Sequence, residues 1–224
     1  MSIMSRLKSA TAELHRQAEG TSLQQRLVKG ALPRDLYAAF LGQMYLAHSA
    51  LEGAIREVSA THRGFATVVR DYHQREPQLS EDLDFLGVDL DAITAVGATD
   101  TLLADIHQVA REQPVALLGM LYVLEGSTNG SKFIARAIRR EYGLGLGPGA
   151  SYLDPHGERQ QERWQAFKRD MDDVGFTETE TSAIVDAARR MFRALTDVSD
   201  ELSEPAGDRP SRPGPAAAAS PATA

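Results

Sequence analysis

The sequence predicts an all-α protein. Apolar residues recur at spacings of three and four along most of the chain, and no stretch shows the convincing alternation of a strand. Gly and Pro residues mark the intervals between these periodic segments. A chain of 224 residues suits one ordinary domain. We expect a single helical domain over residues 1–204 and a disordered low-complexity tail over residues 205–224, which has nothing to bury.

Five helices are expected in the first half of the chain. Leu7, Ala10, Leu14 and Ala18 step by three and four, as on one face of an amphipathic helix. Pro33 suits the first turn of a helix, where its missing N–H is not needed. The expected helices span residues 3–19, 23–28 (ending at Gly30), Pro33 through Ile55, 65–74 and 80–86.

Four more helices are expected in the second half. Thr99 or Asp100 is a suitable cap for a helix over residues 101–112. Its side chains expected to face inward are Leu103, Ile106 and Val109. The remaining helices should span residues 114–142, 157–174 and 178–203, and the Gly- and Pro-rich residues 143–157 should form a loop.

Composition excludes several classes of protein. The net charge of −7 disfavours a general nucleic-acid partner. The absence of Cys excludes disulfides, thiolate metal sites and cysteine nucleophiles. The N-terminus has no apolar signal-peptide core, and the longest apolar run, of about ten residues, is too short to span a bilayer. We therefore expect a cytoplasmic protein without membrane insertion.

The first candidate site lies on the first helix. Lys8 and His15 are seven residues apart, so they share a helix face about 10 Å apart along the axis. Glu19 follows His15 by one turn and can reach its ring. A carboxylate bonded to one ring nitrogen raises the basicity of the other, as a metal-ligating histidine requires. Spacing alone leaves two interpretations open: a ligand site, or a surface histidine with ordinary ion-pair neighbours.

The second candidate site is the stretch VLEGSTNGSKF in the middle of the helix over residues 114–142. Gly126 and Gly130 lie on one face with Gly119, Tyr122 and Phe133, although each glycine costs a helix about 1 kcal/mol relative to alanine. The polar flanks exclude a membrane dimer motif. Two interpretations remain: close helix packing, or backbone lying against a flat ligand where a Cβ atom would collide.

Together the two sites describe a flat ligand between two helices, and haem suits that description. LKSATAELHRQAEG resembles the proximal helix of the haem oxygenases, and LYVLEGSTNGSKFIARAI resembles the distal helix of their bacterial branch. LVKGALPRDLYAAFLGQMYLAHSALE, FKRDMDDVGF and AARRMF are also similar in order and spacing. The resemblance covers residues 5–202, essentially the whole expected domain.

This resemblance implies an all-α, haem-oxygenase-like domain in which haem lies between a proximal helix and a kinked distal helix. It implies oxygen-dependent ring opening of haem to biliverdin, with release of ferrous iron and carbon monoxide. O₂ and an external electron donor, a reductase or a ferredoxin, would be required. A phytochrome is one biliverdin acceptor that such an activity could supply.

The resemblance also implies roles for individual residues. His15 matches the proximal iron ligand, and Glu19 matches its hydrogen-bond partner. Gly126 and Gly130 match the distal glycines whose backbone faces the oxygen-binding side. The residues that match contacts to the haem propionates are Lys8, Tyr122 and Lys168, and the residue that matches an aromatic pocket wall is Phe192.

Two positions depart from the mammalian enzymes of the family. Ser127 stands where they carry a distal aspartate, and His48 stands where they carry a distal tyrosine. We interpret both as candidates for the distal proton relay, with a satisfied core histidine as the alternative for His48. The other histidines are interpreted as exposed helix or loop residues: His62, His73, His107 and His156.

The rival functions belong to other classes. A haem carrier or sensor would use the same His15 without turnover, and it is the main alternative. A thiamine-degrading hydrolase on a similar scaffold would need a cysteine nucleophile, which the sequence lacks. A di-iron bundle would need Glu-x-x-His motifs on two helices, and the sequence contains none.

Overall fold

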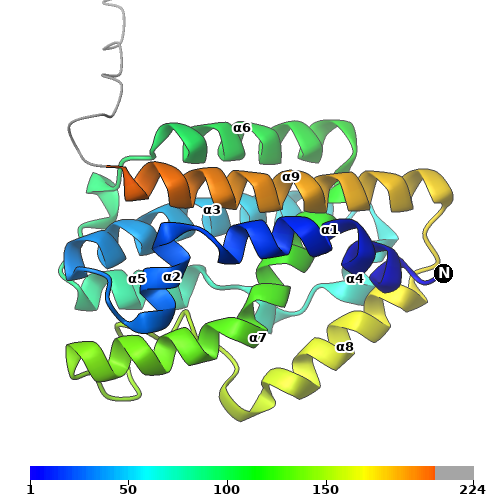
Figure 1. Cartoon of the computed structure of the whole chain (residues 1–224). Coiled ribbons are helices and arrows are strands. Elements are labelled where there is room, and N and C mark those ends of the chain that lie inside the picture. Colours follow the sequence, from blue (N-terminus) through cyan, green and yellow to red (C-terminus); the bar gives the residue numbers. More distant parts are fainter. Residues whose placement is uncertain (205–224) are drawn as a thin grey trace, which may run out of the picture.

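The computed structural model describes residues 1–204, apart from the side chain of Arg63, and these residues are predominantly helical (Figure 1). They contain no strand, so the predicted all-α class is confirmed. None of the helices within this range is long and apolar enough to cross a bilayer. The tail predicted over residues 205–224 lies outside the described residues.

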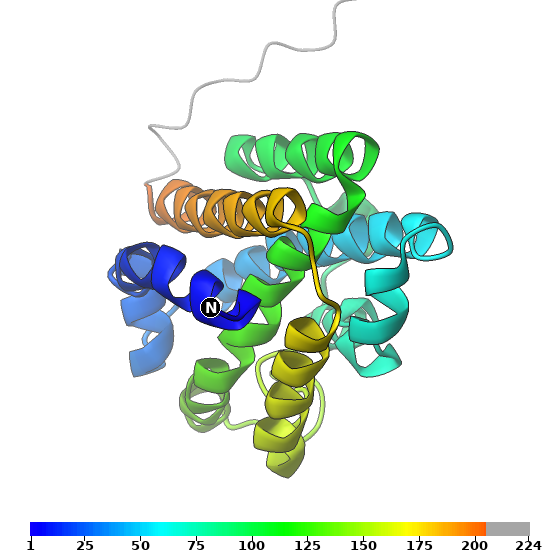
Figure 2. The same cartoon turned by 90° about the vertical axis from the view of Figure 1, so that its right-hand side faces the viewer.

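The described residues form a series of α-helices along the chain. They are α1 (Ile3–Glu19), α2 (Ser22–Lys29), α3 (Arg34–Val58), α4 (Arg63–Val68), α5 (Glu76–Phe85), α6 (Gly97–Glu112), α7 (Leu117–Tyr142), α8 (Gln160–Asp173) and α9 (Glu178–Ser203). Helix α9 packs against α1, α6 and α7, and α3 packs against α5 and α6. In both views α1 lies between α9 above and the lower layer of α7 and α8 (Figure 1, Figure 2).

Buried apolar side chains form two clusters. One joins α1, α9 and the first half of α7 through residues such as Leu7 and Leu117. The other joins α2, the start of α3, α5 and the second half of α7 through residues such as Leu27 and Ile138. Burying a side chain of this size contributes about 1.5–3 kcal/mol. Members of both clusters border the cavity described below, so the two cores hold its walls in place.

The structure confirms α1, α2, α3, α7, α8 and α9 to within a few residues of their predicted bounds. Their ends carry local signals that the sequence makes visible. Ser2 accepts a hydrogen bond from the Ser5 N–H at the start of α1. Thr177 and Glu180 form a capping box at the start of α9. Gly30 closes α2 in the left-handed conformation.

Two predicted helices have different bounds. The helix expected over residues 65–74 is the shorter α4, followed by a 3₁₀ turn at Asp71–His73. The Nδ1 atom of His73 accepts the N–H of Arg70 at 3.1 Å, which removes that N–H from helical bonding. The helix expected over residues 80–86 begins earlier, at Glu76. Pro77 suits its first turn and is the start signal that the prediction overlooked.

Helix α6 begins at Gly97, not at residue 101, so neither Thr99 nor Asp100 is its cap. The N–H groups of Gly97 and Ala98 donate to the carboxylate of Glu201, at 3.0 and 2.7 Å. A negative charge is favourable at a helix N-terminus, but this one belongs to α9 and could not be read from the local sequence. Ile106 and Val109 face inward as predicted, together with Leu102, whereas Leu103 is half-buried.

Candidate functional site

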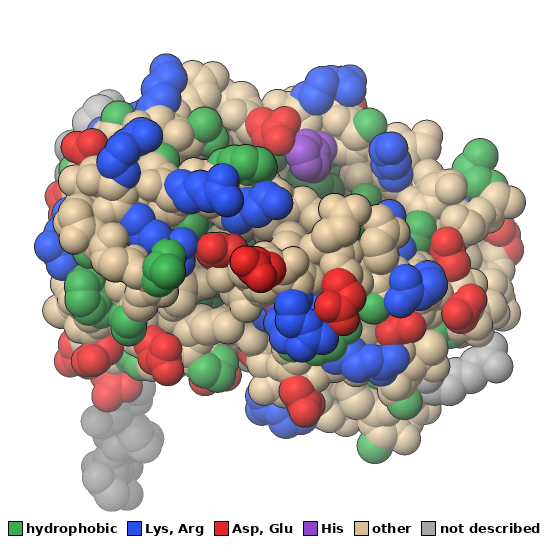
Figure 3. Space-filling view, turned by 90° about the horizontal axis from the view of Figure 1, so that it is seen from below, with side chains coloured by type: hydrophobic (Ala, Val, Ile, Leu, Met, Phe, Trp, Pro, Cys, Tyr) green, Lys and Arg blue, Asp and Glu red, His purple; other side chains and the backbone are tan. Residues whose placement is uncertain are grey.

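A cavity of about 1290 Å³ opens between α1, α7 and α8, and its inner end is bordered by α3 and the 143–157 loop. It exceeds the range of about 300–1,000 Å³ that is usual for small-molecule pockets. Figure 3 shows the lower face of the molecule, where Lys and Arg side chains border a hollow that contains a histidine. The ten residues to which the resemblance or the proton-relay interpretation gives a role all line this one cavity: Lys8, His15, Glu19, His48, Tyr122, Gly126, Ser127, Gly130, Lys168 and Phe192.

His15 stands on the α1 wall of the cavity. Its Nδ1 atom lies 3.4 Å from Oε2 of Glu19, one helical turn on, and about half of its side chain is exposed. The ring of Phe192 from α9 lies 5.7 Å from the imidazole ring, centroid to centroid. Because Glu19 occupies the Nδ1 side, Nε2 is the nitrogen left to bind a ligand.

The glycines of α7 divide into two kinds. A Cβ atom on Gly119 would lie 1.9 Å from the carbonyl oxygen of Ile184 in α9, so this glycine serves close helix packing. A Cβ atom on Gly126 would make only an ordinary 3.5 Å contact with Trp164, and one on Gly130 would meet nothing within 4 Å. Neighbouring protein atoms therefore do not explain Gly126 and Gly130, both of which border the cavity.

Polar side chains between these glycines bond to the backbone of their own helix. Ser127 Oγ donates to the carbonyl of Leu124 at 2.7 Å, and Asn129 Nδ2 donates to the carbonyl of Gly126 at 2.9 Å. Such bonds compete with the helical ladder, and Gly/Ser sequences are a common cause of kinks. The axis of α7 changes direction midway, so its two halves border different parts of the molecule (Figure 1, Figure 2).

His48 is buried in α3 with both ring nitrogens engaged. Nδ1 lies 3.1 Å from Oε1 of Glu52, and Nε2 lies 3.3 Å from the hydroxyl of Tyr152. Oε1 of Glu52 also accepts the backbone N–H of Arg75 at 2.7 Å. His48 is therefore a satisfied histidine, but it also borders the cavity with its partner Tyr152.

The match to a known protein family spans the helical domain. The family model described as "Heme oxygenase" matches residues 1–201. The chain belongs to the haem oxygenase family. The haem oxygenase of Takifugu rubripes is 25% identical over 203 residues, which are 88% of this chain and 73% of that protein. The one from Xanthomonas campestris is 30% identical over 143 residues, 62% of this chain and 76% of that protein.

A solved structure of another haem oxygenase has the same fold. The crystal structure of heme oxygenase-2 from Synechocystis sp., in complex with heme and NO, superposes with a TM-score of 0.84 at 20% identity. The superposition covers 90% of this chain and 85% of that one. The predicted haem-oxygenase-like arrangement of helices is thereby confirmed.

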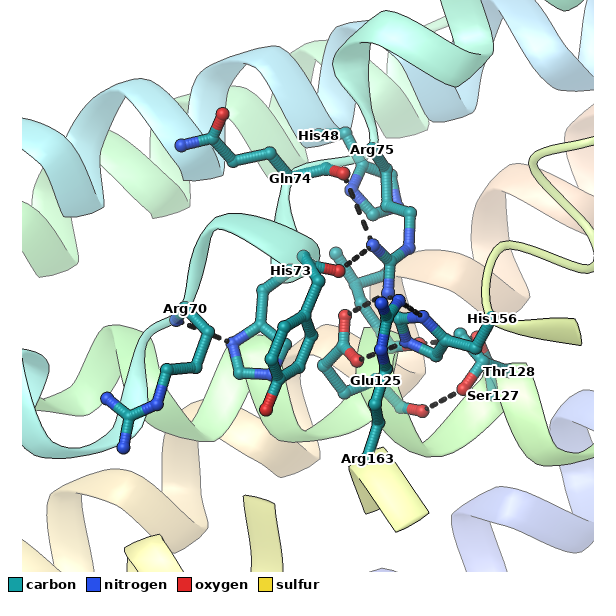
Figure 4. Close-up of polar contacts among 12 residues, drawn as sticks. His48, Arg70, His73, Gln74, Arg75, Glu125, Ser127, Thr128, His156 and Arg163 are labelled. Atoms are coloured by element: carbon teal, nitrogen blue, oxygen red, sulfur yellow. Dashed lines mark hydrogen bonds and ion pairs between the residues drawn. The ribbon is translucent and has the colours of Figure 1, made fainter. Parts of the chain in front are cut away.

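A buried polar network lies beside the cavity, and the sequence did not reveal it (Figure 4). Arg75 Nη2 donates to Glu125 Oε1 at 2.7 Å. His156 lies between Arg163, 2.6 Å from its Nδ1, and Glu125, 3.5 Å from its Nε2. Burial alone would raise the pKa of Glu125, but hydrogen bonding to His156 and the charge of Arg75 hold that pKa below its usual value.

This network joins four parts of the chain next to the bend of α7. Glu125 directly precedes Gly126, Arg75 precedes α5, His156 ends the 143–157 loop and Arg163 belongs to α8. Because each part contributes one side chain, no spacing within a single helix indicates the set. The one available signal was Glu125, a carboxylate within the otherwise apolar run that leads to Gly126.

Two histidines that were interpreted as exposed are buried. His156 is held in the network described above, and His73 packs with its ring centroid 4.6 Å from that of Tyr72 and 5.5 Å from that of Phe167. The interpretation was wrong because His156 lies in a loop without periodicity, and because residues Asp71–His73 form a 3₁₀ turn in place of the end of the predicted helix. His107 is exposed as predicted, and His62 is half-buried.

Burial of His73 should make stability depend on pH. Burial lowers the pKa of His73 to about 4, whereas an unfolded histidine titrates near 6.5. The unfolded chain therefore binds this proton first as the pH falls, so stability is lost between about pH 6.5 and 4. From pH 7.5 to pH 5 the loss from this group should be about 2 kcal/mol.

Urea unfolding of the His73→Asn variant at pH 7.5 and pH 5 measures the loss of stability that His73 causes. The Asn Oδ1 atom can accept the Arg70 N–H in place of the ring nitrogen, so the fold is kept and the pH-dependent loss shrinks. His107→Asn, at an exposed histidine of α6, is the matched control. Equal pH dependence in the two variants would contradict the buried, neutral state of His73.

Proposed function

We propose that this protein opens haem by oxidation to biliverdin, with release of ferrous iron and carbon monoxide. O₂ is the oxidant, and an external donor supplies electrons. The observation that carries the proposal is that His15 and the bare backbone at Gly126 and Gly130 border one cavity from different helices. A planar macrocycle suits this arrangement, with one face toward the imidazole and the other toward the glycines.

His15 would bind the iron through Nε2. The Glu19 carboxylate, 3.4 Å from Nδ1, would accept its hydrogen, which would fix the tautomer and raise the basicity of Nε2. A neutral imidazole does not push electron density as a thiolate does, and a thiolate favours O–O cleavage. An imidazole ligand would therefore suit a reaction in which the porphyrin ring itself is oxidised. The bound haem supplies the redox chemistry, and the protein supplies orientation and protons.

The other wall residues would orient the ligand. Gly126 and Gly130 let the backbone of α7 approach a flat ligand and leave room for a small molecule such as O₂. Phe192 supports the imidazole ring and adds an apolar surface. Lys8 and Lys168 border the side of the cavity that α1 and α8 form, where a cation can meet a propionate.

A spectroscopic assay tests the proposal. Hemin is added to the protein, then ascorbate in air, with catalase present to remove free peroxide and with an iron(II) chelator. We expect the main haem absorption band to disappear while biliverdin absorption and the chelated iron increase. A haem complex whose spectrum persists under these conditions would favour the carrier or sensor function instead.

The partners follow from the reaction. The cell would supply electrons through a reductase or a ferredoxin, and a biliverdin acceptor such as a phytochrome could consume the product. We also propose a cytoplasmic location, where such electron donors could reach the protein. Purified candidate donors can be tested by replacing ascorbate with each of them and measuring biliverdin formation.

Lys8, Lys168 and Tyr122 should orient haem through its propionates. The ring of Tyr122 packs against that of Trp164, with 6.0 Å between the ring centroids, so Tyr122→Phe keeps the ring in place. In a Lys8→Ala/Lys168→Ala/Tyr122→Phe variant each lost contact should weaken haem binding by about 1 kcal/mol or less, as expected at a solvent edge. The isomer ratio of the product should change, because a rotated haem presents a different edge to the reacting oxygen.

Chromatography of the product measures the ratio, with Lys29→Ala on the exposed face of α2 as control. An unchanged ratio and affinity would remove these three residues from the site.

A further inference from the structure

Tyr152 enters the cavity from the 143–157 loop and meets His48 there. Its hydroxyl lies 3.3 Å from Nε2 of His48, and the two rings meet edge to face at 5.4 Å. Both residues line the cavity. Burial raises the pKa of Tyr152 far above its usual value, so its hydroxyl keeps its hydrogen at any physiological pH.

The hydrogen bonds around His48 have a defined direction. Oε1 of Glu52 already accepts the N–H of Arg75, and a carboxylate has no hydrogen to donate. Nδ1 of His48 must therefore donate to Glu52. In the neutral ring Nε2 then accepts, and its donor is the hydroxyl of Tyr152. The tyrosine oxygen retains lone pairs that can accept a hydrogen bond from the cavity side.

Five other hydroxyl groups at the cavity donate their hydrogens to the backbone. Those that donate to main-chain carbonyls, at 2.6–2.8 Å, are Thr11, Ser127, Thr128, Ser131 and Ser199. Ser127 stands where a distal acid was expected, yet its hydrogen is held by Leu124. Tyr152 differs because its partner is an imidazole that can take up and release a proton.

We propose that Tyr152 is the proton donor that faces the bound ligand, supplied by the His48–Glu52 pair. This inference rests on the proposed function. In that reaction the external donor supplies electrons, and O₂ takes up one proton for each electron on its way to water. When Nε2 of His48 is protonated, it donates to the Tyr152 oxygen, and the Tyr152 hydrogen turns toward the cavity. The Tyr152 O–H bond then breaks toward the bound ligand while the oxygen takes up the proton of Nε2. Glu52 stabilises the charged ring before the transfer, and solvent restores the proton to the neutral ring afterwards.

Asp82 is the positioning residue for this tyrosine. Its fully buried carboxylate on α5 accepts the N–H of Gly149 at 2.6 Å and that of Tyr152 at 2.8 Å. It also accepts both the N–H and the hydroxyl of Ser151, at 3.1 and 2.6 Å. Four donors from one loop thus converge on a single side chain. They fix the backbone from which Tyr152 reaches His48.

The loop needs glycine to wrap around Asp82. Gly149 has a φ of +101°, a left-handed conformation that other residues rarely adopt. A Cβ atom there would lie 2.8 Å from the ring of Phe85. The hydroxyl of Tyr37 donates to the Gly149 carbonyl at 3.0 Å. The arrangement holds the loop against α3 and α5 in one conformation.

The Tyr152→Phe variant tests the proposal, with Tyr142→Phe as the matched control. Tyr142 donates to the carbonyl of Leu32 at 2.8 Å and does not border the cavity. We expect Tyr152→Phe to bind haem with unchanged affinity, to form biliverdin about 100-fold more slowly, as removal of a general acid does, and to release more peroxide when catalase is left out. In the haem-free protein the ¹⁵N resonance of His48 Nε2 should shift in this variant and not in the control.

The Asp82→Asn variant tests positioning, with Ser151→Ala as the milder control that removes one of the four bonds. If Asp82 acts through Tyr152, the Asp82→Asn/Tyr152→Phe double variant should be no slower than Tyr152→Phe alone, measured below the unfolding temperature. Additive losses would assign Asp82 a merely structural role.

The outcomes separate this inference from the function on which it rests. A wild-type protein that forms no biliverdin overturns the proposed function, and the relay fails with it. A wild-type protein that forms biliverdin while Tyr152→Phe does so at the same rate overturns the relay alone. An unshifted His48 resonance in Tyr152→Phe would show that the two side chains are not bonded, and would also overturn it.

Discussion

Replacing His15 with alanine should leave haem in the cavity but nearly abolish biliverdin formation. Haem can still bind, because most of its binding free energy comes from burying its apolar faces, at about 25 cal/mol per Å². The iron would lose its only proposed protein ligand. Changing residues that merely orient a metal ligand costs about 10–100-fold, so we expect a loss of at least about 100-fold when the ligand itself is removed.

Three measurements check this result. The absorption spectrum of the haem complex should change, because water replaces the imidazole at the iron. Added imidazole should restore part of the activity by filling the space that His15 leaves. The melting temperature should be unchanged, since about half of the His15 side chain is exposed. His107→Ala, at an exposed histidine on α6, is the control. A normal spectrum and normal turnover in His15→Ala would mean that another residue is the ligand.

The helices and the cavity wall could be predicted because their signals are local. His15 and Glu19 are one helical turn apart, and a single helix brings them to the 3.4 Å separation of Nδ1 and Oε2. Gly126 and Gly130 share a face for the same geometric reason. Once the order of the helices followed from the family resemblance, the opposing walls of the cavity followed as well.

Features that join distant segments could not be predicted. Glu201 caps α6 from α9, and Asp82 on α5 holds the backbone of a loop far along the chain. The pair of Arg75 and Glu125 joins the segment before α5 to α7. Glu201, Asp82 and Arg75 look like ordinary surface residues in the sequence, because the partner of each has no fixed spacing from it. Glu125 is unusual in its apolar run, but the sequence does not show its partner. Tyr152 was missed as a cavity residue for the same reason.

The three glycines of α7 should respond differently to substitution. Gly119→Ala places a Cβ atom against the backbone of α9 and should lower the free energy of unfolding by about 3 kcal/mol or more. Gly126→Ala and Gly130→Ala have room for the methyl group and should raise it by up to about 1 kcal/mol each through helix propensity. Urea unfolding of the haem-free variants measures all three.

Leucine at Gly126 or Gly130 should keep the helix but block the reaction. The larger side chain would extend from α7 into the cavity, where Gly130 has nothing within 4 Å of its Cβ position, and would occupy the space proposed for O₂. We expect circular dichroism like that of the wild type. Biliverdin formation should be at least about 100-fold slower, which corresponds to an activation free energy about 3 kcal/mol higher. Binding of carbon monoxide to the ferrous haem complex, followed by absorption, should weaken in parallel because the same space is filled.

The matched control is Gly53→Leu on α3. A Cβ atom at Gly53 also meets nothing within 4 Å, and Gly53 does not border the cavity. If either α7 variant formed biliverdin at the wild-type rate, the bare backbone of α7 would not face the reacting side of the ligand.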